Sequence, residues 1–263
     1  MKLYDRVHRI HRELAAQGLS PDQPLKVSDL TPFDQFHYHG TKAVEEAIAA
    51  LGLKPGMRVL DIGAGLGGPA RYIAERTGAH VTALELQEDL SAIAEDLTRR
   101  CGLSALVDHR CGNVLDGVAG NFDAIVSMLC FLHIPDRVRL FAVCRSVLKK
   151  GGTIYIEDFG RNRDATPAET EALAIKVQCR HLPTPEEYGG DLASAGFAAV
   201  QLTDMTADWT AYTASRLASY RAARERNVTI HGADVVDGLD DFFATVAGLF
   251  ASGLIAGVKI TAS

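Results

Sequence analysis

The chain has 263 residues, of which 47% are hydrophobic and 23% charged; this composition excludes an intrinsically disordered chain and predicts one α/β domain with an attached cap. Its 27 basic and 33 acidic residues give a net charge of −6, so the chain has no overall attraction for phosphate backbones, and nucleic acid is not the expected partner. No apolar run approaches the roughly 18 residues of a membrane span, and the charged first residues lack the apolar core of a signal peptide, which predicts a cytoplasmic protein.

The N-terminal part of the chain predicts helices and no strand. Residues 2–17 carry apolar side chains at three- and four-residue steps, the spacing of an amphipathic helix. A polar, proline-containing stretch ends that helix, and a second helix is predicted over 41–51. The apolar residues that set the first spacing are Leu3, Val7, Ile10 and Leu14. We therefore expect residues 1–55 to form a helical cover ahead of the main domain.

From residue 57 onward, short apolar runs alternate with helical stretches. Such alternation predicts βαβ units and a parallel sheet covered by helices on both faces. The expected strands are 57–62, 80–85, 105–109, 122–127, 152–158, 197–203 and 254–261, and the expected helices are 68–77, 88–101, 136–149, 184–195 and a helical block over 207–250. The prediction is an α/β fold with a seven-strand, mostly parallel sheet: residues 56–203 form the core, and 204–263 form a helical lid, inserted before the last strand, together with that strand.

The strongest local signal is VLDIGAGLGG at 59–68, in which a predicted strand runs into a glycine-rich turn before a helix. Gly63 and Gly65 allow the backbone to approach a ligand closely, and the free N–H groups at the start of the helix suit an anionic or polar group. Glu85 ends the next strand, where a carboxylate can accept hydrogen bonds from both hydroxyls of a ribose. The loop therefore predicts a ligand that contains a nucleoside.

Two ligand classes fit this loop, and the residue before it favours one of them. Gly63, Gly65 and Gly68 satisfy the dinucleotide pattern GxGxxG, so a nicotinamide- or flavin-dependent oxidoreductase is one interpretation. Asp61 ends the first strand, where its carboxylate would repel a pyrophosphate but attract the amino group of S-adenosylmethionine, which carries no phosphate. S-adenosyl-L-methionine is therefore the expected cofactor.

Five segments resemble the motifs of class I S-adenosylmethionine-dependent methyltransferases: VLDIGAGLGGPARYIAER, VTALEL, CGNVLD, FDAIVSMLCFLHI and LKKGGTIYIEDF. The resemblance implies a Rossmann-like fold and a methyltransferase activity. It places Asn113 against the edge of the adenine, where Asp is the usual residue and where the Asn carbonyl can still accept a hydrogen bond from the adenine amino group. The donor-binding residues that it implies are Asp61, Gly63, Gly65, Glu85, Leu86, Asn113, Val114 and Met128.

Further segments narrow the resemblance to small-molecule methyltransferases. DQFHYHGTKAVEEAI and GGPAR resemble sarcosine/dimethylglycine N-methyltransferases and sterol or tocopherol C-methyltransferases. TPEEY and the late helical insertion resemble phosphoethanolamine N-methyltransferases, in which a histidine after the fourth strand assists catalysis; His133 matches that position. The chain departs from this last group because Phe159, Cys179 and His181 stand where the group has phosphate ligands, and because no tyrosine lies between Tyr4 and Tyr38.

The expected reaction is methyl transfer to a small-molecule acceptor. An amine nitrogen is the first choice, and C- or O-methylation of a lipid-like or specialised metabolite is the alternative. His133 is the candidate base, because an imidazole can remove the acceptor's proton near neutral pH; its alternative role is to cap a helix. The predicted acceptor contacts are Tyr38, His39, Cys130, Glu157 and His181, and core packing or solvated strand ends would explain the same residues equally well.

Metal binding and disulfides are not expected. His37 and His39 are spaced like a pair of metal ligands but have no Cys, Asp or Glu ligand in register. The five cysteines are widely spaced and odd in number, which favours reduced thiols. An NAD-dependent oxidoreductase and a non-catalytic binding domain stay open as alternative classes, and the oligomeric state is open as well.

Overall fold

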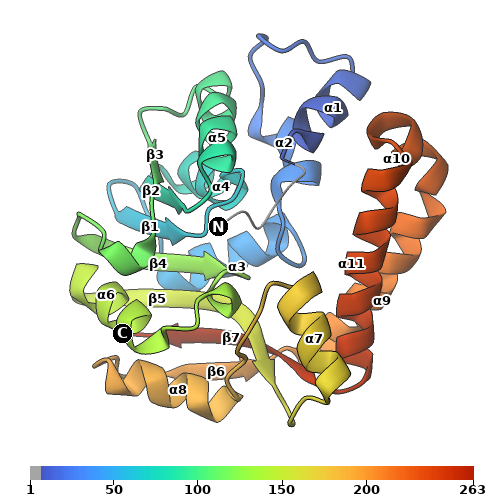
Figure 1. Ribbon diagram of the computed structural model, residues 1–263. Coiled ribbons are helices and arrows are strands. Elements are labelled where there is room, and N and C mark those ends of the chain that lie inside the picture. Colours follow the sequence, from blue (N-terminus) through green and yellow to red (C-terminus); the bar gives the residue numbers. More distant parts are fainter. Residues whose placement is uncertain (1–6) are drawn as a thin grey trace.

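The computed structural model describes residues 7–263, which are built around a seven-stranded sheet with the strand order β3-β2-β1-β4-β5-β7-β6. β1 to β5 are paired in parallel, while β7 runs antiparallel to β5 and β6. The strands are β1 (Arg58–Ile62), β2 (His80–Glu85), β3 (Val107–Cys111), β4 (Phe122–Met128), β5 (Leu148–Arg161), β6 (Gln201–Asp204) and β7 (Ile255–Ala262). The predicted α/β class and the mostly parallel sheet are confirmed (Figure 1).

Helices cover both faces of this sheet. On one face, α6 and α8 bury Leu140 and Leu192 in the same cluster as Ile154 of β5. On the other face, α3 and α4 pack in a cluster that contains Ile73 and Tyr155. These helices and the neighbouring α5 are α3 (Thr41–Leu51), α4 (Gly68–Thr77), α5 (Glu88–Arg100), α6 (Arg137–Val147) and α8 (Pro185–Ser194). Successive residues of β5 therefore point to opposite faces, as expected for a strand.

Most strand boundaries lie within two residues of the sequence prediction, and those of β5 and β6 differ by more. β5 is longer than expected because Leu148 already pairs with Phe122, ahead of an irregularity in the register. β6 starts only at Gln201, although Phe197 was included in the predicted strand. Phe197 is buried but lies in the turn after α8, so the apolar run there reflects burial and not strand pairing.

A buried ion pair joins the N-terminal cover to the core. The fully buried guanidinium of Arg71 on α4 donates to Asp34 at 2.9 Å and to the backbone oxygen of Leu66 at 2.6 Å. Gly68 permits this close packing, because a Cβ at that position would collide with the backbone of Asp34. The end of α2 (Val27–Asp34) is thereby held against the glycine-rich loop.

The helix α2 was not predicted, because its residues were interpreted as part of the polar, proline-containing stretch between two helices. Proline cannot donate to the carbonyl of Ser28, and the hydroxyl of Thr31 donates to that carbonyl instead, at 3.3 Å. The predicted first helix is observed as α1 (Arg9–Ala16), and the part of the prediction before residue 7, with Leu3, lies outside the described residues.

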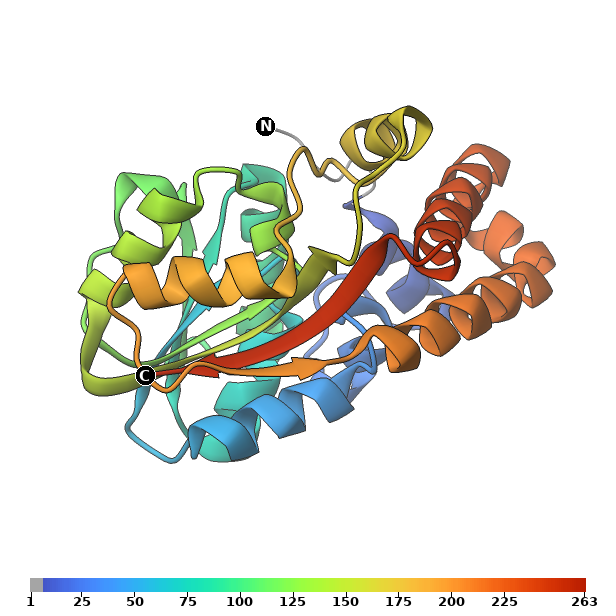
Figure 2. The same ribbon diagram turned by 90° about the horizontal axis from the view of Figure 1, so that it is seen from below.

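Three helices lie between β6 and β7, where the helical insertion was predicted, and they project away from the sheet (Figure 2). They are α9 (Thr206–Ala222), α10 (Arg224–His231) and α11 (Ala233–Ala251). α10 contacts the N-terminal cover, since the buried carboxylate of Glu13 accepts hydrogen bonds from His231 at 2.7 Å and from Arg226 at 2.6 Å. Within residues 7–263, no helix combines the length and the apolar character that would be needed to cross a bilayer.

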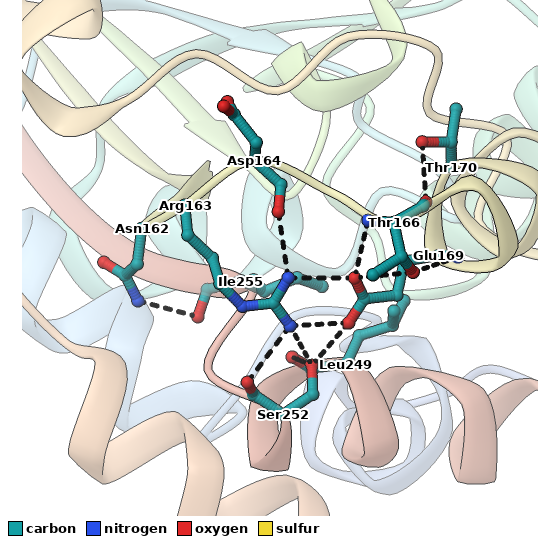
Figure 3. Close-up of polar contacts among 9 residues, drawn as sticks. All are labelled: Asn162, Arg163, Asp164, Thr166, Glu169, Thr170, Leu249, Ser252 and Ile255. Atoms are coloured by element: carbon teal, nitrogen blue, oxygen red, sulfur yellow. Dashed lines mark hydrogen bonds and ion pairs between the residues drawn. The ribbon is translucent and has the colours of Figure 1, made fainter.

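A further helix, α7 (Pro167–Lys176), follows β5 and was also missed by the sequence prediction. Figure 3 shows the contacts that fix its start: Arg163 donates to both carboxylate oxygens of Glu169, at 2.9 and 2.6 Å, and to the backbone oxygen of Ser252, at 3.2 Å. These hydrogen bonds, with the Arg163 guanidinium first among them, hold the pKa of Glu169 well below its usual range. Because Ser252 follows the last residue of α11, Arg163 connects α7 to the end of the helical insertion.

Candidate functional site

One cavity gathers all eight predicted donor-binding residues. It lies at the carboxyl ends of β1, β2 and β4, and its volume is about 410 Å³. β2 and β3 extend the sheet on one side of β1, and β4 and the later strands extend it on the other side (Figure 1). Ligands of open α/β sheets bind where the strand order reverses in this way. The lining residues are Phe36, His37, Asp61, Ile62, Gly63, Ala64, Gly65, Pro69, Leu84, Glu85, Leu86, Gly112, Asn113, Val114, Leu115, Met128, Leu129, Cys130, His133, Ile134 and Pro135.

The glycine-rich loop forms the floor of this cavity. Gly63 has a φ of 80°, and a Cβ there would collide with the side chain of Cys130. Gly65 has a φ of 54°, and its N–H donates to Glu85 at 2.9 Å. Both conformations lie in the left-handed region, which glycine adopts without the steric cost that other residues incur. The two glycines therefore bring the loop close both to β2 and to the segment after β4.

Two buried carboxylates face each other across the loop. Burial, assisted by the charge of Glu85, raises the pKa of Asp61 to about 7, and Asp61 Oδ2 has no hydrogen-bond partner. Burial also raises the pKa of Glu85, although its carboxylate accepts hydrogen bonds from the N–H groups of Gln87 and Gly65. A buried acceptor without a partner is costly and is satisfied best by a donor that carries positive charge. This pair therefore fits a ligand with an ammonium group and disfavours a diphosphate.

The segment after β3 supplies the opposite wall of the cavity. Asn113 Oδ1 accepts the N–H of Leu115 at 3.0 Å and so caps a short 3₁₀ helix, η1 (Val114–Asp116). A carbonyl oxygen has two lone pairs, so one remains for an adenine amino group. Asn113, Val114 and Leu86 all line the cavity, as predicted for an adenine pocket, while Met128 lines it from β4.

His133 lies at the mouth of this cavity, in the 3₁₀ helix η2 (Phe131–His133) that follows β4. Its Nδ1 lies 3.2 Å from the backbone oxygen of Gln178. A carbonyl only accepts, so Nδ1 carries the hydrogen and the lone pair is left on Nε2. Burial lowers the pKa of His133, while the hydrogen bond to Gln178 raises it. The imidazole is therefore neutral near pH 7 and able to accept a proton.

Comparison with protein families adds a decisive observation to this geometry. Residues 60–156 match the family model described as a methyltransferase domain. Residues 60–156 are therefore similar to a methyltransferase domain. The matched residues include the glycine-rich loop, the acidic ends of β1 and β2 and the His133 segment, so the predicted resemblance is confirmed for the part of the chain that forms the cavity.

Curated proteins similar to this chain include two groups of N-methyltransferases. Phosphoethanolamine N-methyltransferase 1 of Zea mays is 35% identical over 169 residues, which cover 64% of this chain and 33% of that protein. Glycine/sarcosine/dimethylglycine N-methyltransferase of Actinopolyspora halophila is 29% identical over 178 residues, which cover 67% of this chain and 32% of that protein. The chain thus spans about a third of the length of these relatives.

The fold of this chain is also found in solved structures. Phosphoethanolamine N-methyltransferase 2 of Haemonchus contortus, solved with S-adenosyl-L-methionine, aligns with a TM-score of 0.81 at 21% identity, covering 88% of this chain and 54% of that chain. At this level of identity the likeness concerns the fold, including the seven-stranded sheet with its antiparallel last strand.

Two predicted acceptor contacts, Tyr38 and His39, do not line the cavity. Tyr38 is buried in an aromatic cluster, with its ring centroid 5.0 Å from that of Trp209. His39 pairs with Asp208 at 2.6 Å. Their neighbours Phe36 and His37 line the cavity instead, so the FHYHG segment does reach the cavity, but through residues that the sequence analysis did not select.

Glu157 and Asp158 lie within β5, which continues to Arg161; they point to opposite faces of the sheet and do not line the cavity. Glu157 accepts a hydrogen bond from the hydroxyl of Tyr155 at 2.7 Å, and Asp158 accepts one from Tyr188 at 3.0 Å. His181 lies in a separate groove that adjoins the cavity at Pro135. Of the five predicted acceptor contacts, the structure brings Cys130 alone to the lining, within residues 7–263.

Cys130 lies at the centre of the site but is not poised as a nucleophile. Its side chain is partly buried, and burial raises the pKa of the Cys130 thiol well above its usual value. The nearby carboxylates of Glu85, Asp158 and Asp61 raise it further. A reactive cysteine needs the thiolate form, so Cys130 serves here as a small apolar wall against Gly63.

Proposed function

We propose that this chain transfers a methyl group from S-adenosyl-L-methionine to a small-molecule acceptor, with an amine nitrogen as the first choice. The observation that carries the proposal is Asp61, whose buried Oδ2 lacks a hydrogen-bond partner beside a glycine-rich loop. An ammonium group supplies the missing donor, whereas a dinucleotide would bring a diphosphate against two carboxylates.

Different residues on the cavity wall bind different parts of the donor. Asp61 holds the ammonium group, Glu85 accepts the ribose hydroxyls, and Asn113 accepts the adenine amino group, with Leu86, Val114 and Met128 as apolar neighbours. Gly63 and Gly65 allow the loop backbone to lie close to the donor. When bound, the sulfonium supplies an electrophilic methyl group.

The protein has two tasks beyond binding the donor. It must align the acceptor with the methyl group, and such positioning supplies roughly 7–11 kcal/mol of barrier lowering. It must also receive the proton that an amine or hydroxyl acceptor loses, and His133 offers the lone pair of Nε2 for this purpose. The apolar residues around His133, including Leu129 and Ile134, exclude water from this end of the cavity.

The charges around the cavity favour an acceptor without a phosphate. Among the described residues that line the cavity, none is Lys or Arg. Two carboxylic acids, Asp61 and Glu85, line it instead. A phosphomonoester carries almost two negative charges at neutral pH and would be buried here without a cation. The proposed acceptor is therefore an amine without a phosphate, in contrast to the substrates after which the phosphoethanolamine N-methyltransferases are named.

A second candidate is transfer to carbon or oxygen of a lipid-like metabolite. The mostly apolar lining around Leu129, Ile134 and Pro135 favours it. The two candidates share the donor site and differ only in the acceptor.

The test is incubation of the protein with methyl-labelled S-adenosylmethionine and a metabolite extract, followed by separation of the labelled products. The expected product is a methylated amine that is not retained by an anion exchanger. Donor binding with no labelled product from any extract would contradict the activity, and a labelled phosphate ester would contradict the proposed acceptor class.

Replacing Glu85 by Gln is expected to weaken donor binding about tenfold or more, because hydrogen bonds to charged groups contribute about 1.5–3 kcal/mol. Gln keeps the size of the side chain, but its NH₂ group would face backbone N–H groups whose hydrogen bonds Glu85 now accepts. Isothermal titration calorimetry with S-adenosylhomocysteine measures the effect. Glu88→Gln, in the first turn of α5, is the matched control, and equal affinities of the two variants would remove Glu85 from the ribose role.

A further inference from the structure

Gln178, which follows α7, has a backbone conformation that residues other than glycine rarely adopt. Its φ is 56°, in the left-handed region, where glycine is the usual residue after a helix. Its carbonyl oxygen lies 3.2 Å from Nδ1 of His133, although the two residues are 45 positions apart in the chain. Such conformations persist only where the surrounding structure holds them, and they cluster at functional sites. The contact with His133 indicates what this one is for.

Hydrogen bonds around Gln178 hold this conformation. The N–H of Cys179 donates to the backbone oxygen of Leu173 at 2.9 Å, which turns the chain back over the last turn of α7. The side-chain amide of Gln178 donates to the backbone oxygen of Ile175, also at 2.9 Å. Leu173 and Cys179 are buried in the same cluster as Leu132, the middle residue of η2. The end of α7 and the short helix η2 thus share one apolar core.

α7 itself is connected to the helical insertion at both of its ends. At its start, Arg163 joins Glu169 to Ser252, next to the end of α11 (Figure 3). At its end, Lys176 forms an ion pair with Asp241 of α11. The carbonyl that contacts the imidazole therefore projects from a segment whose position is set by several tertiary contacts.

The contact decides which nitrogen of the His133 ring carries the hydrogen. In a neutral imidazole one nitrogen donates and the other accepts, so the partner of one nitrogen sets the role of the other. Within residues 7–263, no side chain forms a hydrogen bond with this ring, so the Gln178 carbonyl selects the Nδ1–H form. Without this carbonyl the hydrogen would be free to reside on Nε2, and the nitrogen left for the acceptor would then have no lone pair.

We propose that Gln178 is a positioning residue for the methyl transfer: its left-handed backbone aims its carbonyl oxygen at Nδ1 of His133 and thereby keeps the lone pair on Nε2. The angle φ is the torsion that places this carbonyl relative to α7, so the sign of φ determines whether the oxygen reaches the imidazole. Gln178 acts through its main chain and not through its side chain. This inference rests on the proposed function, in which His133 accepts the proton.

Three variants separate this role from a general effect on stability. Gln178→Pro fixes φ at about −65°, which turns the carbonyl by roughly 120° relative to α7. Within residues 7–263, the Gln178 N–H makes no backbone hydrogen bond that proline would remove. Gln178→Gly removes the side chain but permits the observed φ. Ala199→Pro is the matched control, because Ala199 also has a positive φ, of 46°, and does not line the cavity.

Two readouts are needed, and the first requires no acceptor. Histidine labelled with nitrogen-15 is followed by NMR above neutral pH in the complex with S-adenosylhomocysteine, and the chemical shifts of the ring nitrogens distinguish the Nδ1–H from the Nε2–H form. The signals of His133 are assigned by their loss in His133→Ala. The second readout is the turnover number, measured beside the dissociation constant of the donor.

In the unchanged protein and in Gln178→Gly we expect the Nδ1–H form of His133. In Gln178→Pro we expect the Nε2–H form to appear and turnover to fall about 10- to 100-fold, the loss that a small misplacement of a catalytic group can cause. Donor affinity stays the same in this variant, and Gln178→Gly keeps most of the turnover. Ala199→Pro lowers the melting temperature but leaves the His133 signals and the turnover at their wild-type values.

Either of two results overturns the proposal: the Nε2–H form of His133 in the unchanged protein, or a Gln178→Pro variant that keeps the Nδ1–H form and the turnover of the unchanged protein. The first result needs no variant at position 178, so it decides the question even if Gln178→Pro does not fold. The proposed function fails in a different way: the unchanged protein then binds no donor or transfers no methyl group, whichever form of His133 the NMR signals show.

Discussion

Asp61→Asn is expected to abolish most of the donor binding while making the free protein more stable above neutral pH. The lost pairing with the donor's ammonium group corresponds to about 3 kcal/mol, or roughly a 100-fold weaker dissociation constant. In the free protein, the Asp61 carboxylate has a pKa raised from 3.8 to about 7, so ionising it while buried costs up to about 4 kcal/mol. Asn carries no charge and avoids that cost.

The pH dependence of both effects follows from the direction of this shift. The folded state holds the Asp61 proton more tightly than the unfolded state, so the contribution of Asp61 to stability declines as pH rises from about 4 to 7. Thermal unfolding should therefore show the advantage of Asp61→Asn growing over this range. Donor binding requires the ionised form, so the affinity of the unchanged protein should rise up to about tenfold per pH unit below pH 7 and then level off.

Asp123→Asn is the matched control for Asp61→Asn. Asp123 lies at the start of β4, at the opposite end of the sheet, and hydrogen bonds from Lys149 and the Arg58 amide outweigh burial and lower the pKa of Asp123. Its replacement should therefore destabilise the protein above about pH 4, the opposite sign, and leave donor affinity unchanged. A donor affinity in Asp61→Asn that equals that of Asp123→Asn would refute the ammonium role of Asp61.

His133→Ala is expected to lower turnover by about 10²- to 10⁴-fold, the usual contribution of a general base, with donor affinity unchanged. Because burial lowers the pKa of His133, the rate of the unchanged protein should rise with pH through a value below 6.5 and be constant above it. The variant should lack this limb of the pH profile. Initial rates under saturating donor, measured from pH 5 to 9, give both results.

His80→Ala is the control for His133→Ala, since His80 begins β2 at the end of the sheet remote from the cavity. The two variants make the same chemical change at different ends of the molecule. Turnover of His133→Ala at the level of His80→Ala would show that the acceptor loses its proton to water or to another group.

The sequence carried enough information to predict the sheet and the residues that come together in the cavity at its carboxyl edge. Asp61 lies near the end of the buried strand β1, and Gly63 and Gly65 follow that strand. Residues at this position in a parallel sheet lie at its carboxyl edge, where ligands bind. Local signals were weaker where tertiary contacts decide the conformation. α2 contains Pro32 because the hydroxyl of Thr31 replaces the missing donor. α7 begins with the same Thr-Pro-x-Glu capping signal as α8, so a search for capping boxes would have found it.

The acceptor side depended on which way each side chain points, and the sequence does not fix this in irregular segments. Tyr38 and His39 were selected, but Phe36 and His37 line the cavity, because His39 adopts a left-handed conformation and turns toward Asp208. In β5, by contrast, the alternation of a strand was sufficient to predict that Glu157 and Asp158 point to opposite faces. That alternation places Glu157 and Asp158 on separate faces of the sheet.

The central claim is that the carboxylate of Asp61 selects a cationic nucleoside over a dinucleotide. Calorimetric titration of the same protein sample with S-adenosylmethionine and with NADH at pH 7.5 tests it most directly. We expect saturable binding of S-adenosylmethionine and no measurable heat with NADH. Binding of NADH at comparable affinity, or no binding of S-adenosylmethionine, would contradict it.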